Sequence, residues 1–298
     1  MKHLLSIETL ARADMETILA AAVNLKKERG RHAKLPLTGQ TWVMLFSKSS
    51  TRTRVSFEVG IRELGGEVIF LPANEIQLGR GEPIKDTARV LGRMVHGAVF
   101  RTFAQSDVEE FAHYAGIPTI NALTDQEHPC QILADIFTFQ EKHGSIQGNV
   151  VTFIGDGAGN VATSLIFAAA KAGFELRIAA PKAFQPSADL VKRAGGKIVV
   201  TEDVQAAAAG ADLLYTDVWV SMGREKESAD RIRQLSGYQI NAAVIGRARP
   251  GALVMHCLPA YRGKEIDEAT FEANAQTIFD EAENRLHVQK AILSWLVS

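Results

Sequence analysis

Short apolar runs alternate with longer amphipathic segments along most of this chain, and this alternation is what most constrains its fold. We expect a first series of strands at 41–46, 68–71, 98–103 and 119–122, separated by helical segments at 50–64, 85–95 and 108–115. A second series has strands near 150–154, 176–180, 198–200, 213–218 and 253–256, with helices at 160–172, 187–194 and 204–209. Such alternation predicts parallel sheets covered by helices on both faces.

The polar stretch 141–148, Glu-Lys-His-Gly-Ser-Ile-Gln-Gly, divides the two series. A chain of 298 residues is also long enough for two domains. We therefore predict an α/β protein with two doubly wound parallel-sheet domains, at 1–143 and 144–266. Ligands of such sheets bind at the carboxyl ends of the strands, and the polar motifs of this chain follow the apolar runs directly.

Composition excludes several classes of function. Lys and Arg number 33 and Asp and Glu 34, so the net charge of −1 gives no basic excess for binding nucleic acid or a membrane surface. No run approaches the roughly 18 apolar residues of a membrane span, and Glu8, Asp14 and Glu16 interrupt any export signal. Two cysteines, Cys130 and Cys257, suit a reducing cytosol. We expect a cytoplasmic protein with no membrane or nucleic-acid partner.

The most informative local sequence is 47–58, Ser-Lys-Ser-Ser-Thr-Arg-Thr-Arg-Val-Ser-Phe-Glu, which follows a predicted strand and opens a helix. Ser50, Thr51 and Thr53 offer hydroxyls, and Arg52 offers a guanidinium fork that matches phosphate or carboxylate oxygens. The amides and dipole of a helix N-terminus also favour negative charge. An ordinary capped helix is the alternative, although two arginines in a first turn, Arg52 and Arg54, oppose the dipole. We predict a site for a small anion.

A second polar group lies at 127–135, Glu-His-Pro-Cys-Gln-Ile-Leu-Ala-Asp. Pro129 suits the first turn of a helix, which places His128 at the N-cap and Gln131 just inside. An imidazole and a carboxamide in these positions can hold a carbonyl oxygen or an amide. The alternative is a plain helix cap with Cys130 facing the core.

Two further positions follow strands. Arg101 is a charged residue near the end of an otherwise apolar strand, where it belongs either to the same site or to a structural ion pair. The turn 155–160, Gly-Asp-Gly-Ala-Gly-Asn, lacks the third glycine and the later acidic residue of the dinucleotide fingerprint. We interpret it as a tight turn that presents Asn160.

The last two polar positions lie late in the second series. Asp217 follows a predicted strand, with Ser221 four residues further on, and a carboxylate at a strand end can hold an ammonium group. Cys257 follows the final strand beside a proline turn. A lone cysteine is more often a small buried hydrophobe, but a thiol beside a cation-binding carboxylate can also serve chemistry.

Together these motifs resemble the aspartate/ornithine carbamoyltransferase family, and within it the ornithine branch. The matching sequences are Ser-Thr-Arg-Thr-Arg at 50–54, His-Pro-Cys-Gln at 128–131, Asp-x-x-x-Ser-Met-Gly at 217–223, His-Cys-Leu-Pro at 256–259 and Asn-Arg-Leu-His at 284–287, in family order. Two departures are Tyr261, where the family commonly has His, and a longer turn at 157–160. Neither changes the reaction class.

The resemblance implies a transferase that moves the carbamoyl group of carbamoyl phosphate to the δ-amine of L-ornithine, giving L-citrulline and phosphate in arginine metabolism. It implies that 1–143 binds carbamoyl phosphate, that 144–266 binds ornithine, and that the active site is the cleft between them. A C-terminal helix at about 267–298 would pack back on the first domain. The assembly would be a homotrimer or a multiple of trimers; biosynthetic and catabolic roles both stay open.

Residue by residue, the resemblance implies two sets of ligands. The expected carbamoyl phosphate contacts are Ser50, Thr51, Arg52, Thr53, Gln77, Arg101, His128, Pro129, Cys130, Gln131, Cys257, Leu258 and Arg285. The expected ornithine contacts are Asn160, Asp217, Ser221 and Met222, and the expected catalytic residues are Arg52, Arg101, His128, Asp217 and Cys257.

In the implied reaction the neutral δ-amine attacks the carbamoyl carbon, an oxyanion develops and phosphate departs, so catalysis consists of alignment and charge stabilisation. Arg52, Arg101 and His128 would meet the oxyanion and the leaving group, while Asp217 and Cys257 would orient the amine. We expect no cofactor and no metal, since the cysteines and histidines show no metal-ligand spacing.

Three alternatives stay open. Another carbamoyltransferase, acting on putrescine or an N-acylated ornithine, would share the carbamoyl phosphate half, although the Ser-Met-Gly sequence argues against putrescine. An aspartate carbamoyltransferase would need basic groups where this chain has Asp217. A non-catalytic phosphate-binding or regulatory protein of the same fold is a third class, against which the joint presence of Arg52, Asp217 and Cys257 speaks.

Overall fold

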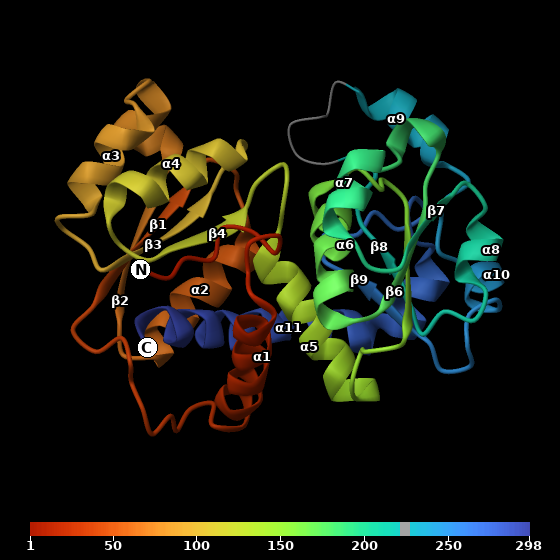
Figure 1. Cartoon of the computed structure of the whole chain (residues 1–298), viewed down its shortest axis with the longest axis horizontal. Helices are drawn as coiled ribbons and strands as arrows, with labels where there is room; N and C mark the ends of the chain where they lie inside the picture. Colours follow the sequence, from red (N-terminus) through yellow and green to blue (C-terminus); the bar gives the residue numbers. More distant parts are fainter. Residues whose placement is uncertain (221–226) are drawn as a thin grey trace. The chain divides into compact units, whose positions relative to one another are not determined.

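The computed structural model describes residues 1–220 and 227–298. The chain divides into two compact units: unit 1 consists of Met1–Phe137 and Glu283–Ser298, and unit 2 of Thr138–Ala282. Each unit contains one parallel sheet with helices packed against it (Figure 1), which confirms the predicted pair of parallel-sheet α/β domains. The domain limits 1–143 and 144–266 stay a prediction.

Unit 1 is built on a four-stranded sheet. Its strands are β1 (Thr41–Phe46), β2 (Glu67–Pro72), β3 (Gly97–Arg101) and β4 (Thr119–Leu123), in the order β2-β1-β3-β4. Its helices are α1 (Arg12–Lys27), α2 (Thr51–Glu63), α3 (Ile84–Leu91) and α4 (Gln105–Ala115), with the short 3-10 helices η1 (Ala73–Glu75) and η2 (Gln77–Arg80). The helices α5 (Pro129–His143) and α11 (Glu268–Val297) contribute residues to both units.

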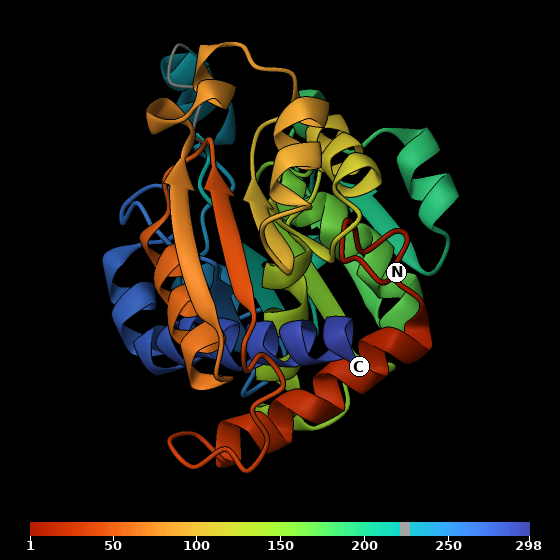
Figure 2. The same cartoon turned by 90° about the vertical axis from the view of Figure 1, so that its left-hand side faces the viewer.

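The chain leaves β1 toward β2 and then returns past β1 to β3, so its direction across the sheet reverses. Because parallel crossovers are right-handed, this reversal places α2 on one face and α3 and α4 on the other. The core on the α3 and α4 face includes Val43, Phe100 and Phe111. On the opposite face, the last part of α11 runs beside α2 (Figure 2), and Gly60 of α2 lies against it.

Unit 2 is built on a five-stranded parallel sheet. Its strands are β5 (Val150–Ile154), β6 (Glu175–Ala179), β7 (Ile198–Thr201), β8 (Leu213–Thr216) and β9 (Leu253–His256), in the order β7-β6-β5-β8-β9. Its further helices are α6 (Asn160–Ala172), η3 (Lys182–Phe184), α7 (Ala188–Ala194), α8 (Val204–Ala208), α9 (Ser228–Leu235) and α10 (Ala242–Ile245). Residues of α8, α10 and the first part of α11 form the core on one face, around Leu214 and Val254.

The structure differs from the sequence-based elements in a few places. The strand expected at 98–103 ends at Arg101, where the pairing of β3 with β4 shifts register, and the strand expected at 213–218 ends at Thr216. The helices α9 and α10 were not predicted; α10 begins where the Asn241 side chain accepts hydrogen bonds from two backbone N–H groups. None of the helices in the described ranges combines the length and hydropathy needed to cross a bilayer.

Each sheet has one point where the strand order reverses, and open α/β sheets bind ligands at the carboxyl ends of the strands beside such a point. In unit 1 it lies between β1 and β3, and in unit 2 between β5 and β8. The motif at 47–58, Arg101, the turn at 155–160 and Asp217 follow these four strands, while His128 and Cys257 follow the neighbouring strands β4 and β9. The topology therefore directs attention to one group of side chains in each unit.

Candidate active site

The first group begins at the N-terminus of α2, directly after β1. Ser50 is the N-cap residue, and its hydroxyl accepts a hydrogen bond from the Thr53 N–H at 3.2 Å. This satisfies one orphan amide of the first turn. Thr51 is exposed and Arg52 is half-buried. The helix is therefore capped, and its first turn also carries the hydroxyls and the guanidinium that an anion site requires.

Arg101 and His128 join this group from the ends of two further elements. Arg101 is 4% exposed at the end of β3, where the register shift re-aims the strand end. His128 directly precedes α5 and is 5% exposed. Burial, followed by the charges of Arg285, Arg101 and Arg52, holds the pKa of His128 well below its usual range. The imidazole is therefore neutral and lies among three guanidinium groups.

Arg285 of α11 links the group together. One of its terminal nitrogens donates to Gln131 Oε1 at 2.5 Å, and the other donates to Thr53 Oγ1 at 3.1 Å. Gln131 in turn donates from Nε2 to Asp135 Oδ1 at 2.8 Å. These bonds bring residues from α2, α5 and α11 to one place in unit 1. We call Arg52, Thr53, Arg101, His128, Gln131 and Arg285 the anion cluster.

The loop that carries His128 is anchored by its neighbour. Glu127 is 3% exposed, and its carboxylate accepts the Ile7 N–H at 2.8 Å. The Thr124 N–H donates to the Glu127 carbonyl at 2.9 Å, which closes the turn between β4 and α5. This anchoring fixes the backbone from which the imidazole projects.

Cys130 is placed in the core. It is fully buried in α5, its thiol donates to the Asn121 carbonyl at 3.5 Å, and burial raises its pKa to about 12. Because the thiolate is the reactive form of cysteine, Cys130 is chemically inert.

We expect iodoacetamide at mildly alkaline pH to alkylate the half-buried Cys257 and to leave Cys130 unmodified, as peptide mass spectrometry would report. In denaturant both should react; equal labelling of the two in the folded protein would contradict this placement.

Other residues expected from the sequence lie at the edges of these groups. Pro129 is the first residue of α5, as its ring favours, and Gln77 is exposed at the start of η2. Ser221 and Met222 lie outside the described residues, so the structure does not bear on them.

The second group begins in the turn between β5 and α6 of unit 2. Gly155 has φ +137°, which other residues rarely adopt, and a Cβ on Gly157 would lie 2.6 Å from Ile178 Cγ2. These glycines are therefore required by backbone geometry, as expected for a tight turn. The turn ends at Asn160, the half-buried first residue of α6.

Arg231 of α9 ties this turn to the segment after β8. It is 4% exposed, pairs with the Asp156 carboxylate, and donates from Nε to the Trp219 carbonyl at 2.8 Å. Its guanidinium also lies over the Phe184 ring, 4.7 Å from the centroid. The loops that carry Asn160 and Asp217 are thus held by one buried cation.

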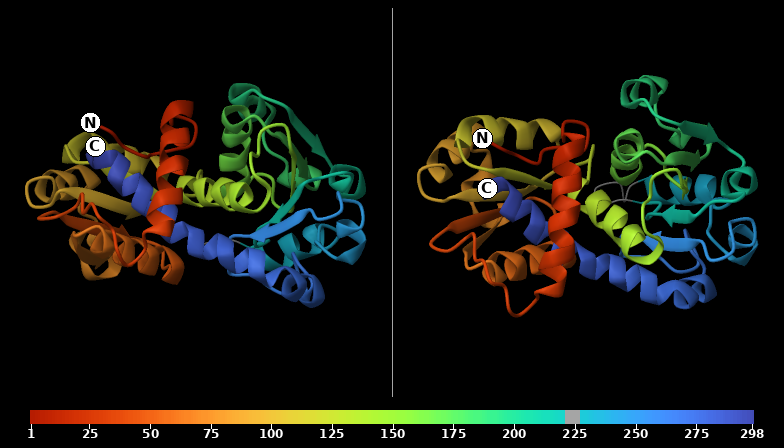
Figure 3. Two further views of the ribbon diagram at one scale, coloured as in Figure 1. Left: turned by 90° about the horizontal axis from the view of Figure 1, so that it is seen from below. Right: turned by 60° about the horizontal axis from the view of Figure 1, so that its bottom comes forward.

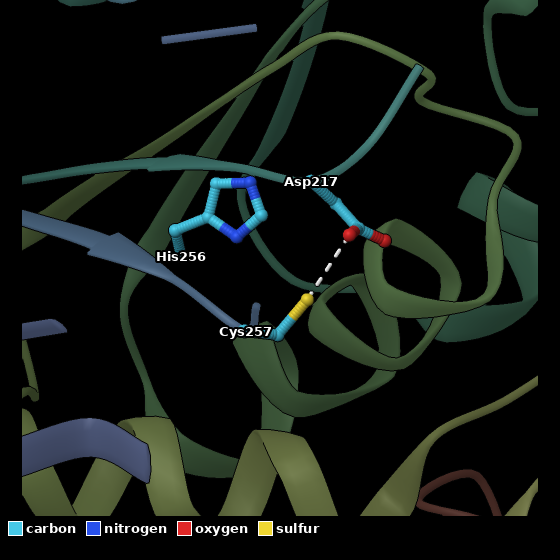
Figure 4. Close-up of side chains that lie close together, drawn as sticks. All are labelled: Asp217, His256 and Cys257. Atoms are coloured by element: carbon cyan, nitrogen blue, oxygen red, sulfur yellow. Dashed lines mark hydrogen bonds between the residues drawn. The ribbon is translucent and has the colours of Figure 1, made fainter. Parts of the chain in front are cut away.

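Asp217 and Cys257 meet at the ends of β8 and β9. The Cys257 thiol donates to Asp217 Oδ1 at 3.0 Å (Figure 4). Burial raises the pKa of Asp217, and the neighbouring Glu265 charge adds to this, while His256, the Cys257 thiol and the Val218 N–H oppose it. The pair places a carboxylate and a thiol side by side, as a site for an ammonium or amine group requires.

His256 is fixed beneath this pair by a network of buried bonds. Its Nδ1 accepts the Leu258 N–H at 2.9 Å, so the proton resides on Nε2, which donates to Glu265 Oε1 at 3.2 Å. Its backbone N–H donates to Glu281 at 2.9 Å. His256 belongs to the His-Cys-Leu-Pro motif but was not among the predicted site residues, although a histidine in an apolar strand directly before Cys257 indicates a buried polar partner.

Within the described ranges, the side chains of Asp217, His256 and Cys257 form a group with metal-ligating atoms, all within 4.8 Å of one another. Sequence spacing did not reveal this group, because Asp217 reaches His256 and Cys257 only through the pairing of β8 with β9. Both nitrogens of His256 are already engaged in the hydrogen bonds described above. The arrangement therefore fits a hydrogen-bonded network better than a metal centre.

The fold and these two groups define a class: a two-sheet α/β protein with an arginine-rich anion cluster in one unit and a carboxylate–thiol pair in the other. Two family models match this chain. Residues 2–141 match the carbamoyl-P binding domain of aspartate/ornithine carbamoyltransferase, and residues 147–296 match its Asp/Orn binding domain. The chain belongs to the aspartate/ornithine carbamoyltransferase family.

Individual relatives agree with this assignment. A protein of Akkermansia muciniphila named ornithine carbamoyltransferase is 54% identical over 299 residues, covering 99% of this chain and 98% of the relative. The crystal structure of anabolic ornithine carbamoyltransferase from Campylobacter jejuni is 42% identical, covers 99% of each chain and gives a TM-score of 0.93. The ornithine carbamoyltransferase from Pyrococcus furiosus is 41% identical with a TM-score of 0.93, covering 99% of this chain and 97% of that one.

Proposed function

We propose that this enzyme transfers the carbamoyl group of carbamoyl phosphate to the δ-amine of L-ornithine, releasing L-citrulline and phosphate. The observation that carries the proposal is that the chain contains two groups of side chains, each suited to one of the two substrates. Unit 1 surrounds a neutral His128 with three guanidinium groups, and unit 2 presents the Asp217 carboxylate beside the Cys257 thiol. The first suits an acyl phosphate, which carries both a phosphate and a carbonyl group, and the second suits a diamino acid.

Carbamoyl phosphate is the ligand of unit 1 in this proposal. Ser50, Thr51, Thr53 and Arg52 at the start of α2 hold the phosphate, where the helix dipole adds to the attraction. Arg101 and His128 meet the carbonyl oxygen, and a neutral imidazole donates one N–H to the developing oxyanion. Gln131, Arg285 and Gln77 complete the ligand set.

L-Ornithine is the ligand of unit 2. Asp217 holds an amino group, Asn160 and the segment with Ser221 and Met222 contact the amino-acid end, and Cys257 orients the δ-amine with Leu258 beside it. The amine must lose its proton to attack, and the departing phosphate accepts that proton. The reaction then requires only that the δ-amine nitrogen reaches the carbamoyl carbon of the other bound ligand.

We also propose the finer features implied by the family: a cytoplasmic homotrimer, or a multiple of trimers, in arginine biosynthesis. Unit 1 offers apolar side chains for assembly, since Val55 of α2 is 53% exposed and Ile69 of the edge strand β2 is 45% exposed. Light scattering on the purified protein measures the assembly, and a monomer at micromolar concentration would contradict it.

A substrate panel tests the function. The purified chain receives carbamoyl phosphate with L-ornithine, putrescine, N-acetylornithine or L-aspartate, and carbamoylated product is measured by mass spectrometry. We expect citrulline to be the dominant product. If putrescine or N-acetylornithine turned over faster than ornithine, that amine would be the acceptor instead. If only aspartate gave a product, the chain would belong to the aspartate branch of its family.

A further inference from the structure

The part of α11 in unit 1 carries an unusual set of buried polar side chains. They are Asn284, Arg285, His287, Gln289 and Lys290, and each is at most 3% exposed. Several of their bonds reach other helices: Asn284 accepts from Lys26 of α1, and Arg285 donates to α2 and α5. In Figure 3, α1 also lies across this part of α11. The position of α11 therefore depends on specific polar partners as well as on apolar packing.

Lys290 is the most completely buried of these cations. Its ammonium donates to Glu63 Oε2 at 2.6 Å and lies 3.0 Å from His32 Nε2 and 3.5 Å from the Leu25 carbonyl. Glu63, the last residue of α2, is itself bound by Arg29 at 3.2 Å. An ammonium with no exposed surface is tolerated only when its charge is paired.

Where the two helices approach, α2 presents a glycine. A Cβ on Gly60 would lie 3.2 Å from Lys290 Cγ and 3.5 Å from Leu286 Cδ1, so α11 packs directly on the α2 backbone. A glycine offers no side chain to interlock with its neighbour, and interlocking side chains are what set the register of packed helices. At this crossing, polar contacts on either side of Gly60 therefore contribute to the register.

Two such contacts flank the glycine. Arg285 binds Thr53 in the first turn of α2, and Lys290 binds Glu63 at its end. Lys290 lies five positions after Arg285, which is about 7.5 Å along the helix axis, and Glu63 lies ten positions after Thr53, which is about 15 Å. Two such contacts at different heights restrict both the sliding and the rotation of α11 against α2, whereas a single contact leaves α11 able to pivot about it.

We propose that Lys290 and Glu63 are positioning residues that set the register of α11 against α2, so that Arg285 reaches Thr53 and Gln131 in the anion cluster. This inference rests on the proposed function, in which that cluster binds carbamoyl phosphate. Neither residue touches the ligand. Their effect is transmitted through the backbone of α11 over the four residues that separate Arg285 from Lys290.

The test replaces Lys290 by methionine, which keeps the aliphatic stem and removes the charge. Glu63 keeps its partner Arg29, so the change leaves no uncompensated buried carboxylate. We expect KM for carbamoyl phosphate and the calorimetric Kd for inorganic phosphate to rise about tenfold, because a small misplacement of an aligned group is costly. KM for ornithine at saturating carbamoyl phosphate should stay within twofold. Lys290→Arg, which can pair with Glu63, should restore most of the phosphate affinity.

The matched control is Lys142→Met, which removes an ion pair of the same 2.6 Å length, to Asp280 in unit 2. It should leave phosphate binding unchanged. If Lys290→Met does not fold, Glu63→Gln tests the same tether and should raise the phosphate Kd. A lowered Tm with unchanged phosphate Kd, or equal rises in both KM values, would overturn the inference. The phosphate titration needs no acceptor amine, so it decides this question even if the substrate panel rejects ornithine.

Discussion

Replacing Arg52 by alanine should lower kcat/KM for carbamoyl phosphate about 100-fold, which corresponds to about 3 kcal/mol for one oriented charged donor. Arg52 lies in the first turn of α2 and is close enough to His128 for its charge to lower that pKa. Its guanidinium should matter most as the phosphate gains charge while leaving, so kcat should fall together with the affinity. Steady-state kinetics with carbamoyl phosphate varied at saturating ornithine measures both effects.

A matched control for this variant lies on the same helix. Arg62 is an exposed arginine in the last turn of α2, and Arg62→Ala should retain nearly full activity. Circular dichroism of both variants establishes that the fold is intact. A folded Arg52→Ala enzyme with wild-type kinetics would remove Arg52 from the phosphate site.

Replacing Asp217 by asparagine should weaken ornithine binding about 100-fold, or about 3 kcal/mol, because a carboxylate that pairs with a bound ammonium is lost while the shape is kept. Carbamoyl phosphate affinity should change little, since its proposed ligands lie mainly in unit 1. Isothermal titration with each ligand separates the two effects. Asp189→Asn, at an exposed carboxylate of α7, is the control and should bind ornithine normally.

The raised pKa of Asp217 adds a pH dependence to this prediction. A carboxyl group with a raised pKa takes up its proton at a higher pH than an ordinary aspartate, so ornithine affinity should fall as the pH drops through that raised value. The asparagine variant should lack this acidic limb. An acidic limb that persists in Asp217→Asn, or an equal loss of carbamoyl phosphate binding, would assign the group to other residues.

Much of the fold could be predicted because the information is local. Strands buried on both faces read as short apolar runs, and helices between them repeat with a different period, so the two parallel sheets follow from the sequence pattern. Pro129 marked the start of α5, and Ser50 was already part of the motif that opens α2. The glycines of the turn after β5 likewise indicated a tight turn rather than a nucleotide site.

The alternatives left open for single residues needed the three-dimensional structure. Cys130 could have faced the ligand or the core, and its bond to the Asn121 carbonyl of β4 shows that the thiol points into the core. Arg101 could not be placed beside His128 from the sequence, and in the structure it lies close enough for its charge to lower the pKa of that imidazole. Helical periodicity does not tell which neighbour a side chain will meet.

The sequence by itself determined most element types, the parallel sheets and the capped helix start at 50–54 with its hydroxyls and guanidinium, because each depends largely on residues close together in the sequence. Only the tertiary structure decided which distant residues become partners. Arg285 meets Gln131 across 154 positions, Cys257 meets Asp217 across 40, and Lys290 meets Glu63 across 227. Those contacts follow from strand order and helix packing, which depend on burying surfaces from the whole chain at once, and no local pattern contains that information.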